Sequence, residues 1–95
     1  MEKRIGIINI VVYDLTAAKE VNSLLSSYSE YILSRNGLPL RDKGIHIINI
    51  VAESSQDIIN SLTGKLGRIL NVEVKCLLTK IRLENNKENY KNILP

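Results

Sequence analysis

The pentapeptide Ile-Ile-Asn-Ile-Val occurs twice in the chain, at 7–11 and at 47–51. Runs of β-branched residues of this length are typical of buried strands. Each copy leads into turn residues and then into a helical pattern, in which Asn-Ser-Leu recurs at 22–24 and at 60–62. Two copies are too few to stack as a solenoid. The repeat therefore predicts two related strand–helix–strand halves.

Composition limits the class of protein. A chain of 95 residues makes one domain with a modest core. Its single cysteine, Cys76, excludes an intrachain disulfide and suits a reducing compartment. No apolar run is long enough to span a bilayer, and Met1–Arg4 lacks the layout of a signal peptide, so we expect a cytoplasmic protein without membrane association. The net charge of +3 permits weak attraction to nucleic acid without requiring it.

The first half predicts a strand over 5–13 and a helix from 17 to about 33, capped by Asp14 or Thr16. The helix is expected to stop at Asn36-Gly37, with Gly37 as a left-handed cap. A short strand over 38–41 should lie at a sheet edge because Pro39 lacks a donor, and 42–44 should turn it into a hairpin.

The second half predicts a strand over 45–52 and a helix to about residue 69, with Ser54 as its cap and Asp57 completing a capping box. A half-buried strand follows at 72–78. The order is β-α-β-β-α-β, an α+β ferredoxin-like split βαβ fold with a four-stranded antiparallel sheet and two helices on one face. The domain should occupy 1–80, and 81–95 should form a polar C-terminal tail that folding does not need.

The second face of this sheet is expected to be aliphatic and without helices. An antiparallel sheet covered on one side usually alternates apolar with polar residues, but the two central strands are apolar on both faces. Burying each large aliphatic side chain is worth roughly 1.5–3 kcal/mol, so a patch of this size seldom stays exposed. We expect a second subunit to cover it, the alternative being the tail. The predicted homo-oligomer interface contains Ile7, Asn9, Val11, Ile47, Asn49 and Val51.

Asn9 and Asn49 are the polar interruptions of that face, and a buried amide needs hydrogen-bonding partners. They either bond to each other or to their symmetry mates, or they line a small-ligand site within the interface.

Catalytic and metal-binding chemistry is poorly supplied. His46 and Cys76 are the only soft ligands, and a third strand between theirs would hold them roughly 10 Å apart, too far for one metal ion. The sequence offers no Ser/His/Asp set and no paired carboxylates. We therefore expect no metal, no cofactor and no enzyme activity.

Gly64-Lys65-Leu66-Gly67-Arg68 contains glycines within a helical pattern and does not fit a P-loop. Each glycine costs about 1 kcal/mol relative to alanine in a helix. An early helix end, a ligand or a partner's backbone would explain them, since glycine permits close approach.

The segment 61–69, followed by Val-Glu-Val-Lys at 72–75, resembles the small proteins called iron-only hydrogenase system regulators. The opening 1–4, the run 10–12 and Arg41 fit as well, so the resemblance covers 1 to about 80. It implies an ACT-like domain akin to the ligand-sensing part of the nickel-responsive repressor. It also implies an effector site near Asp14 and Leu15 at a subunit boundary. This sequence has one histidine where a nickel site would need several, and it lacks a ribbon-helix-helix DNA-binding arm. Both departures from the nickel-responsive repressor argue against nickel sensing and direct operator binding.

Together these features predict a regulatory module, a homo-oligomer (dimer or tetramer) that senses a small-molecule effector or binds a protein partner. Its candidate ligand-binding residues are Asp14, Leu15, Gly64, Lys65 and Gly67. The alternative is a nucleic-acid-binding regulator that uses the basic tail and a sheet edge, and salt-dependent binding to DNA would distinguish it.

Overall fold

The computed structural model describes residues 2–80, so the predicted tail at 81–95 lies outside the described residues. The elements follow the expected β-α-β-β-α-β order, with two short 3-10 helices added. They are β1 (Arg4–Val12), α1 (Leu15–Ser27), η1 (Ser29–Tyr31), β2 (Ile32–Leu40), η2 (Arg41–Lys43), β3 (Ile45–Ser54), α2 (Gln56–Gly67) and β4 (Val72–Leu78).

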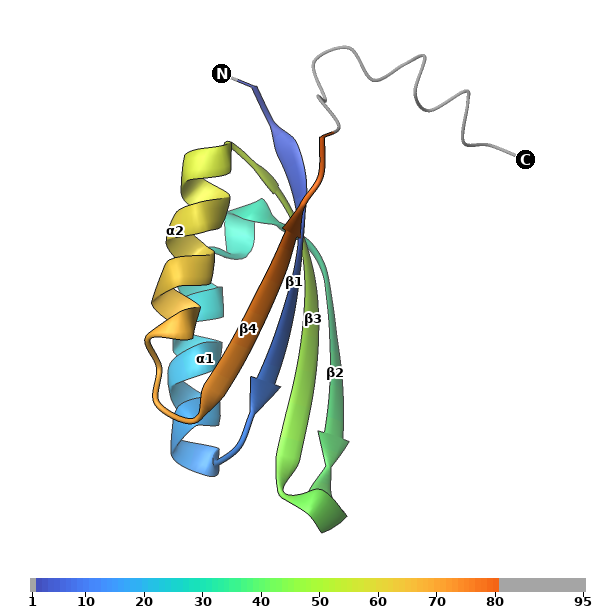
Figure 1. Cartoon of the computed structure of the whole chain (residues 1–95), viewed down its shortest axis with the longest axis vertical. Helices are drawn as coiled ribbons and strands as arrows, with labels where there is room; N and C mark the ends of the chain where they lie inside the picture. Colours follow the sequence, from blue (N-terminus) through green and yellow to red (C-terminus); the bar gives the residue numbers. More distant parts are fainter. Residues whose placement is uncertain (1, 81–95) are drawn as a thin grey trace, which may run out of the picture.

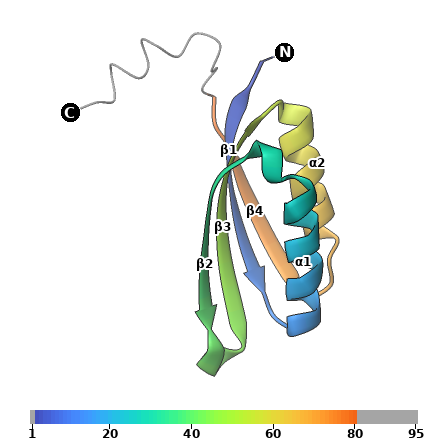
Figure 2. The same cartoon turned by 180° about the vertical axis from the view of Figure 1, so that it is seen from behind.

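The four strands form one antiparallel sheet in the order β2-β3-β1-β4. Both helices cover the same face, as the two opposite views show (Figure 1, Figure 2). The two copies of the repeated pentapeptide are the central strands β1 and β3, and Asn9 lies directly opposite Asn49. The proline-containing strand and β4 are the edges, which confirms the predicted fold.

The core lies between the sheet and the helices. Alternate residues of β1 and β3 point into it, and each helix contributes a stripe at helical spacing. The fully buried members are Ile8, Ile10, Val12, Ala17, Val21, Leu25, Ile48, Ile50, Ala52, Ile59, Leu62 and Leu66. Within residues 2–80, no helix is long and apolar enough to cross a membrane.

The prediction for the end of the first helix was wrong. The helix ends at Ser27, η1 follows, and β2 already begins at Ile32. Asn36 and Gly37 lie within β2 rather than capping a helix, and Gly37 is paired with Ile48. Pairing along most of the long strand β3 outweighs the local helical pattern, as tertiary contacts commonly do.

The start of the second helix also differs by one residue. Ser55, not Ser54, is the N-cap, and its hydroxyl accepts a hydrogen bond from the N–H of Ile58. The helix ends at Gly67 rather than near residue 69. Asn71 then adopts a left-handed conformation (φ 66°) in the turn to β4. The bounds predicted for the last strand, 72–78, are those observed.

Asp14 is the N-cap of α1, and we expect its contribution to stability to depend on pH. Its carboxylate accepts from the Ala17 N–H at 2.6 Å and from the Asn71 amide, so these bonds lower its pKa below 3.8. A lowered folded-state pKa stabilises the fold above 3.8, and this contribution is lost as pH falls through the folded-state value. The melting temperature of Asp14→Ala should therefore be lower than that of the wild type at neutral pH, and the two should become equal in acid. Asp42→Ala, in an exposed turn, is the control; an Asp14→Ala deficit that persists undiminished in acid would contradict the assignment.

Candidate functional site

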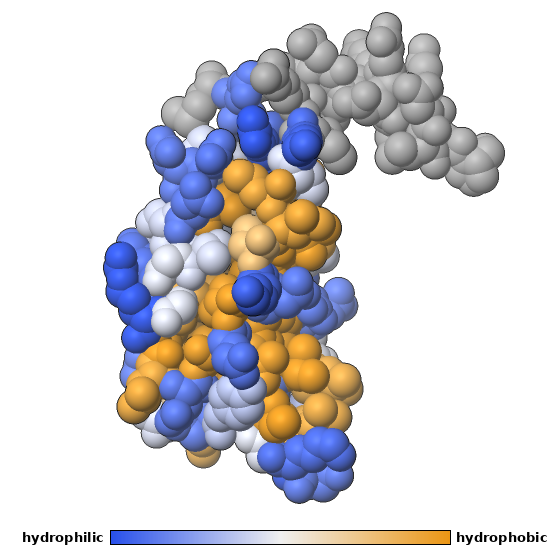
Figure 3. All heavy atoms as spheres, viewed as in Figure 1, coloured by the Kyte–Doolittle hydropathy of each residue, from blue (hydrophilic) through white to orange (hydrophobic). Residues whose placement is uncertain are grey.

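The face of the sheet opposite the helices carries two aliphatic bands. The first runs through Leu38, Ile47 and Val11 and ends at Glu73 on β4. The second runs through Leu77, Ile7 and Val51 and ends at Ser34 on β2. The four residues on the central strands are half-buried, whereas Leu38 and Leu77 on the edge strands are 55% and 60% exposed. Figure 3 shows apolar side chains gathered over the strands and broken by hydrophilic ones. We call this surface the open face.

A row of polar side chains separates the two bands. The strand registers place Asn36, Asn49, Asn9 and Lys75 side by side across all four strands. The amide nitrogen Nδ2 of Asn49 donates to Oδ1 of Asn9 at 2.7 Å. All four residues are exposed in the single chain. The open face is therefore ordered into apolar, polar and apolar bands.

A cavity of about 250 Å³ lies where β1 turns into α1, beside the β2–β3 hairpin. Asp14 and Leu15, both predicted ligand residues, line it. The other lining residues are Val12, Ala18, Arg41, Gly44, Ile45 and His46. We call it the hairpin pocket. Asp14 is already engaged by α1 and Asn71, but among residues 2–80 no hydrogen bond or ion pair engages the Arg41 guanidinium. The pocket thus offers one uncommitted cation beside apolar walls.

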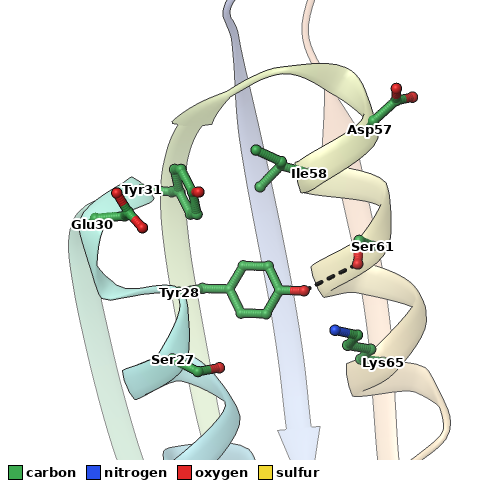
Figure 4. Close-up of a pocket in the computed structure, with 8 residues that line it drawn as sticks. All are labelled: Ser27, Tyr28, Glu30, Tyr31, Asp57, Ile58, Ser61 and Lys65. Atoms are coloured by element: carbon green, nitrogen blue, oxygen red, sulfur yellow. Dashed lines mark hydrogen bonds between the residues drawn. The ribbon is translucent and has the colours of Figure 1, made fainter.

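A second cavity, of about 470 Å³, lies between the end of α1, η1 and the outer side of α2 (Figure 4). We call it the tyrosine pocket. The Tyr28 hydroxyl lies 3.0 Å from the Ser61 hydroxyl, and the Lys65 ammonium lies 5.4 Å from the centre of the Tyr28 ring. The Ser61 bond and then Lys65 lower the pKa of Tyr28, whereas the negative charge of Glu30 raises the pKa of Tyr31. Within this pocket Tyr28 is therefore paired with Ser61 and Lys65, and Tyr31 is paired with Glu30.

The five predicted ligand residues do not meet in one place. Asp14 and Leu15 line the hairpin pocket, and Lys65 lines the tyrosine pocket. Gly64 and Gly67 are exposed on α2 and line neither of these two cavities. A Cβ added at either glycine would meet nothing within 4 Å, so residues 2–80 contain no contact that requires a glycine there.

We therefore expect Gly64→Ala to stabilise the isolated fold. Alanine is favoured over glycine in a helix interior by about 1 kcal/mol, which corresponds to a rise of about 4–8 °C in Tm for a domain of this size. Thermal denaturation followed by circular dichroism measures this. A lower Tm would mean that the Gly64 surface contacts something outside residues 2–80, such as a partner's backbone.

His46 and Cys76 lie on β3 and β4 with β1 between them, as expected. Residues 2–80 contain no group of three or more His, Cys, Asp or Glu side chains placed to hold a metal ion. The His46 ring instead lies beside Gly37, where an added Cβ would come within 3.1 Å of Nε2. We predict that dialysed protein retains no stoichiometric nickel, zinc or iron. Retained metal that is lost in His46→Ala would contradict this.

The tyrosine pocket was not predicted from the sequence. The helix predicted from 17 to about 33 would have contained Tyr28 and Tyr31, but Tyr28 caps α1 and Tyr31 lies in η1. The Tyr28–Ser61 contact joins residues 33 positions apart. Only the packing of α1 against α2 reveals it, so no local pattern could have done so.

Comparison with known proteins identifies the family. The TM1266-like family model, described as "Iron-only hydrogenase system regulator, putative", matches residues 4–76. The chain belongs to this family. The resemblance noted in the sequence is thus confirmed. No curated protein matches the chain.

Solved structures support the same assignment. The uncharacterized protein TM1266 from Thermotoga maritima is 45% identical, with a TM-score of 0.80, over 83% of this chain and 100% of that one. The ACT domain of GTP pyrophosphokinase from Chlorobium tepidum is 20% identical, with a TM-score of 0.68, over 79% and 99%. The C-terminal domain of MgtC from Mycobacterium tuberculosis is 9% identical, with a TM-score of 0.63, over 81% and 88%. The last two establish the fold alone, which is ACT-like.

Proposed function

We propose that this member of the TM1266-like family is a non-enzymatic, cytoplasmic regulatory module that assembles into a homo-oligomer and responds to a small ligand. The observation that carries the proposal is the open face. Its two aliphatic bands are centred on β1 and β3, and both helices cover the opposite face of the sheet. Family membership supports a regulatory role.

The energetics favour a covered open face. Each aliphatic band has two half-buried side chains on the central strands, Val11 with Ile47 and Ile7 with Val51, and the asparagine row separates the two pairs. Full burial of such a side chain from water is worth roughly 1.5–3 kcal/mol, and a half-buried one gains part of this when it is covered. Leu38 on β2 extends one band to one edge of the sheet, and Leu77 on β4 extends the other band to the opposite edge. A second sheet packed on this surface would build a core of the kind found in β-sandwiches.

The hairpin pocket is the part of the molecule that suits a small ligand. Arg41 supplies a planar donor fork for a carboxylate or a similar anion, while Val12, Ala18 and Ile45 supply apolar contact. Because the pocket sits between the start of α1 and the hairpin, a bound ligand would contact the ends of β1 and β3, which carry the open face. Ligand binding and assembly would then influence each other.

Native mass spectrometry of the protein purified from its own cells tests both parts together. We expect a multiple of the 10.7 kDa chain that carries a retained small molecule. Arg41→Gln should lose the small molecule and keep the fold. Lys43→Gln, an exposed neighbour two residues away, is the matched control and should retain it. A ligand-free monomer under the same conditions would contradict the proposal.

The alternative role, binding of nucleic acid, draws on a basic tail that lies outside the described residues. It makes a separate prediction, namely affinity for random DNA that falls steeply with salt. Weak or salt-independent binding would leave the regulatory module as the better account.

A further inference from the structure

The polar row on the open face leaves a self-complementary pair of hydrogen-bonding groups. Asn49 donates to Asn9, so Asn9 retains its NH2 group and Asn49 retains its carbonyl oxygen. If the two amides were exchanged end for end, the roles would reverse, but one asparagine would still keep a donor and the other an acceptor. Burial by a second molecule requires that both groups find partners.

Two simple two-fold arrangements bring one open face onto another. With the axis along the polar row, every residue of that row faces its own copy. The free donor of Asn9 then faces a donor, the free oxygen of Asn49 faces an oxygen, and Lys75 faces the partner's Lys75. That arrangement leaves buried groups unpaired and places like charges together, both of which are unfavourable.

With the axis parallel to the strands, between β1 and β3, the two central strands exchange places. The free Asn9 donor then faces the carbonyl of the partner's Asn49, and the reverse contact forms by symmetry. Lys75 faces the partner's Asn36, whose amide oxygen can accept from it. The bands stay aligned, since Ile47 faces the partner's Val11 and Val51 faces the partner's Ile7.

We propose that the asparagine row sets the register of the assembly, so that two copies stack open face to open face about an axis parallel to the strands between β1 and β3. This inference rests on the proposed function, because it specifies the geometry of the homo-oligomer. Asn9 and Asn49 of both copies would form a hydrogen-bonded cluster of four amides at the centre of an aliphatic interface. This cluster would fix how the two sheets lie on each other. An isologous contact of this kind closes on itself.

The two arrangements differ in where they place the β2–β3 hairpin. Asp42 lies in η2 at the tip of that hairpin, beyond the end of β2. An axis parallel to the strands brings both hairpins to the same end of the dimer. With strands about 4.8 Å apart and sheets about 10 Å apart, the two Asp42 positions lie roughly 15–30 Å from each other, twist and label length included. An axis along the polar row sends them to opposite ends, roughly 35–45 Å apart, because each residue adds about 3.3 Å along a strand.

Pulsed electron double resonance on spin-labelled protein measures this distance. The full chain carries Asp42→Cys with Cys76→Ser, so that one site per subunit is labelled, and Lys43→Cys provides a second label site on the same turn. A distance below about 30 Å at both sites is the expected result. A distance of about 35 Å or more would overturn the inferred register while leaving the oligomer in place. The absence of any dipolar coupling, together with a monomeric mass, would overturn the proposed assembly itself.

A pair of substitutions tests the amides directly. Asn9→Asp removes the free donor of Asn9 and adds a charge next to the oxygen of the partner's Asn49, so we expect at least a tenfold weaker association. Asn22→Asp on the exposed side of α1 is the matched control and should leave association unchanged. Equal association for Asn9→Asp and wild type would overturn the proposal, since the cluster would then not be buried.

Discussion

Ile47→Asp is expected to dissociate the assembly or to prevent its folding. Ile47 lies at the middle of the open face, opposite Val11 on the neighbouring strand. An aspartate there would place an unpaired charge among aliphatic side chains, which costs several kcal/mol unless the face returns to water. The substitution would destabilise the assembled state by this amount. It would destabilise a separate chain little, because there the aspartate stays in water. Analytical ultracentrifugation of the variant should therefore detect monomer or unfolded chain.

The matched control is Ser26→Asp, which introduces the same charge on an exposed position of α1. It should change neither the mass nor the melting temperature appreciably, as expected for a surface substitution. An intact oligomer for Ile47→Asp would mean that the open face is covered in another way.

Leu66→Ala is expected to destabilise the fold strongly. Leu66 is completely buried in the last turn of α2, where it packs in the core beneath the sheet. Truncation of such a leucine costs about 2–5 kcal/mol through lost burial and the cavity left behind. For a domain of this size, 1 kcal/mol corresponds to about 4–8 °C in Tm, so a fall of at least about 8 °C is expected.

Leu70→Ala provides the comparison for this core position. Leu70 lies four residues after Leu66, beyond the end of α2, and is 82% exposed. The same chemical change there should alter the free energy of unfolding by less than about 0.5 kcal/mol. Similar losses for the two variants would mean that α2 is packed with a different face toward the sheet.

The strands of this domain were the most predictable elements. Ile8, Ile10 and Val12 alternate with Ile7, Asn9 and Val11, and this period of two reveals which face each residue occupies without any knowledge of the partner strands. Pro39 correctly marked an edge, because a proline cannot donate to a neighbouring strand. These signals are local, so they survive in the sequence.

The boundary between α1 and β2 could not be predicted in this way. Tyr28, Tyr31 and Ile32 continue the helical spacing of the residues before them, and the choice against a longer helix comes from β3, which is distant in sequence. The long strand Ile45–Ser54 accepts β2 from Ile32 onward, with an irregularity between Ile32 and Ser34. Hydrogen bonds to a distant partner thus outweigh the local pattern.

The candidate site was predictable only in part. Asp14 and Leu15 were expected near an effector site because the family resemblance implies one there, but Arg41 joins them through the hairpin, from across the sheet. Gly64 and Gly67 attracted notice as helix-weakening residues, yet residues 2–80 place nothing against them. Glycines within a helix can be recognised as unusual from the sequence, but the sequence does not show which atoms, if any, approach them.

If a second copy of the chain covers the open face, the wild-type protein must be an oligomer, and sedimentation equilibrium at tens of micromolar measures its mass. We expect an integer multiple of 10.7 kDa, two or greater, that does not fall toward one chain on moderate dilution. A mass of 10.7 kDa across the whole concentration range would contradict it.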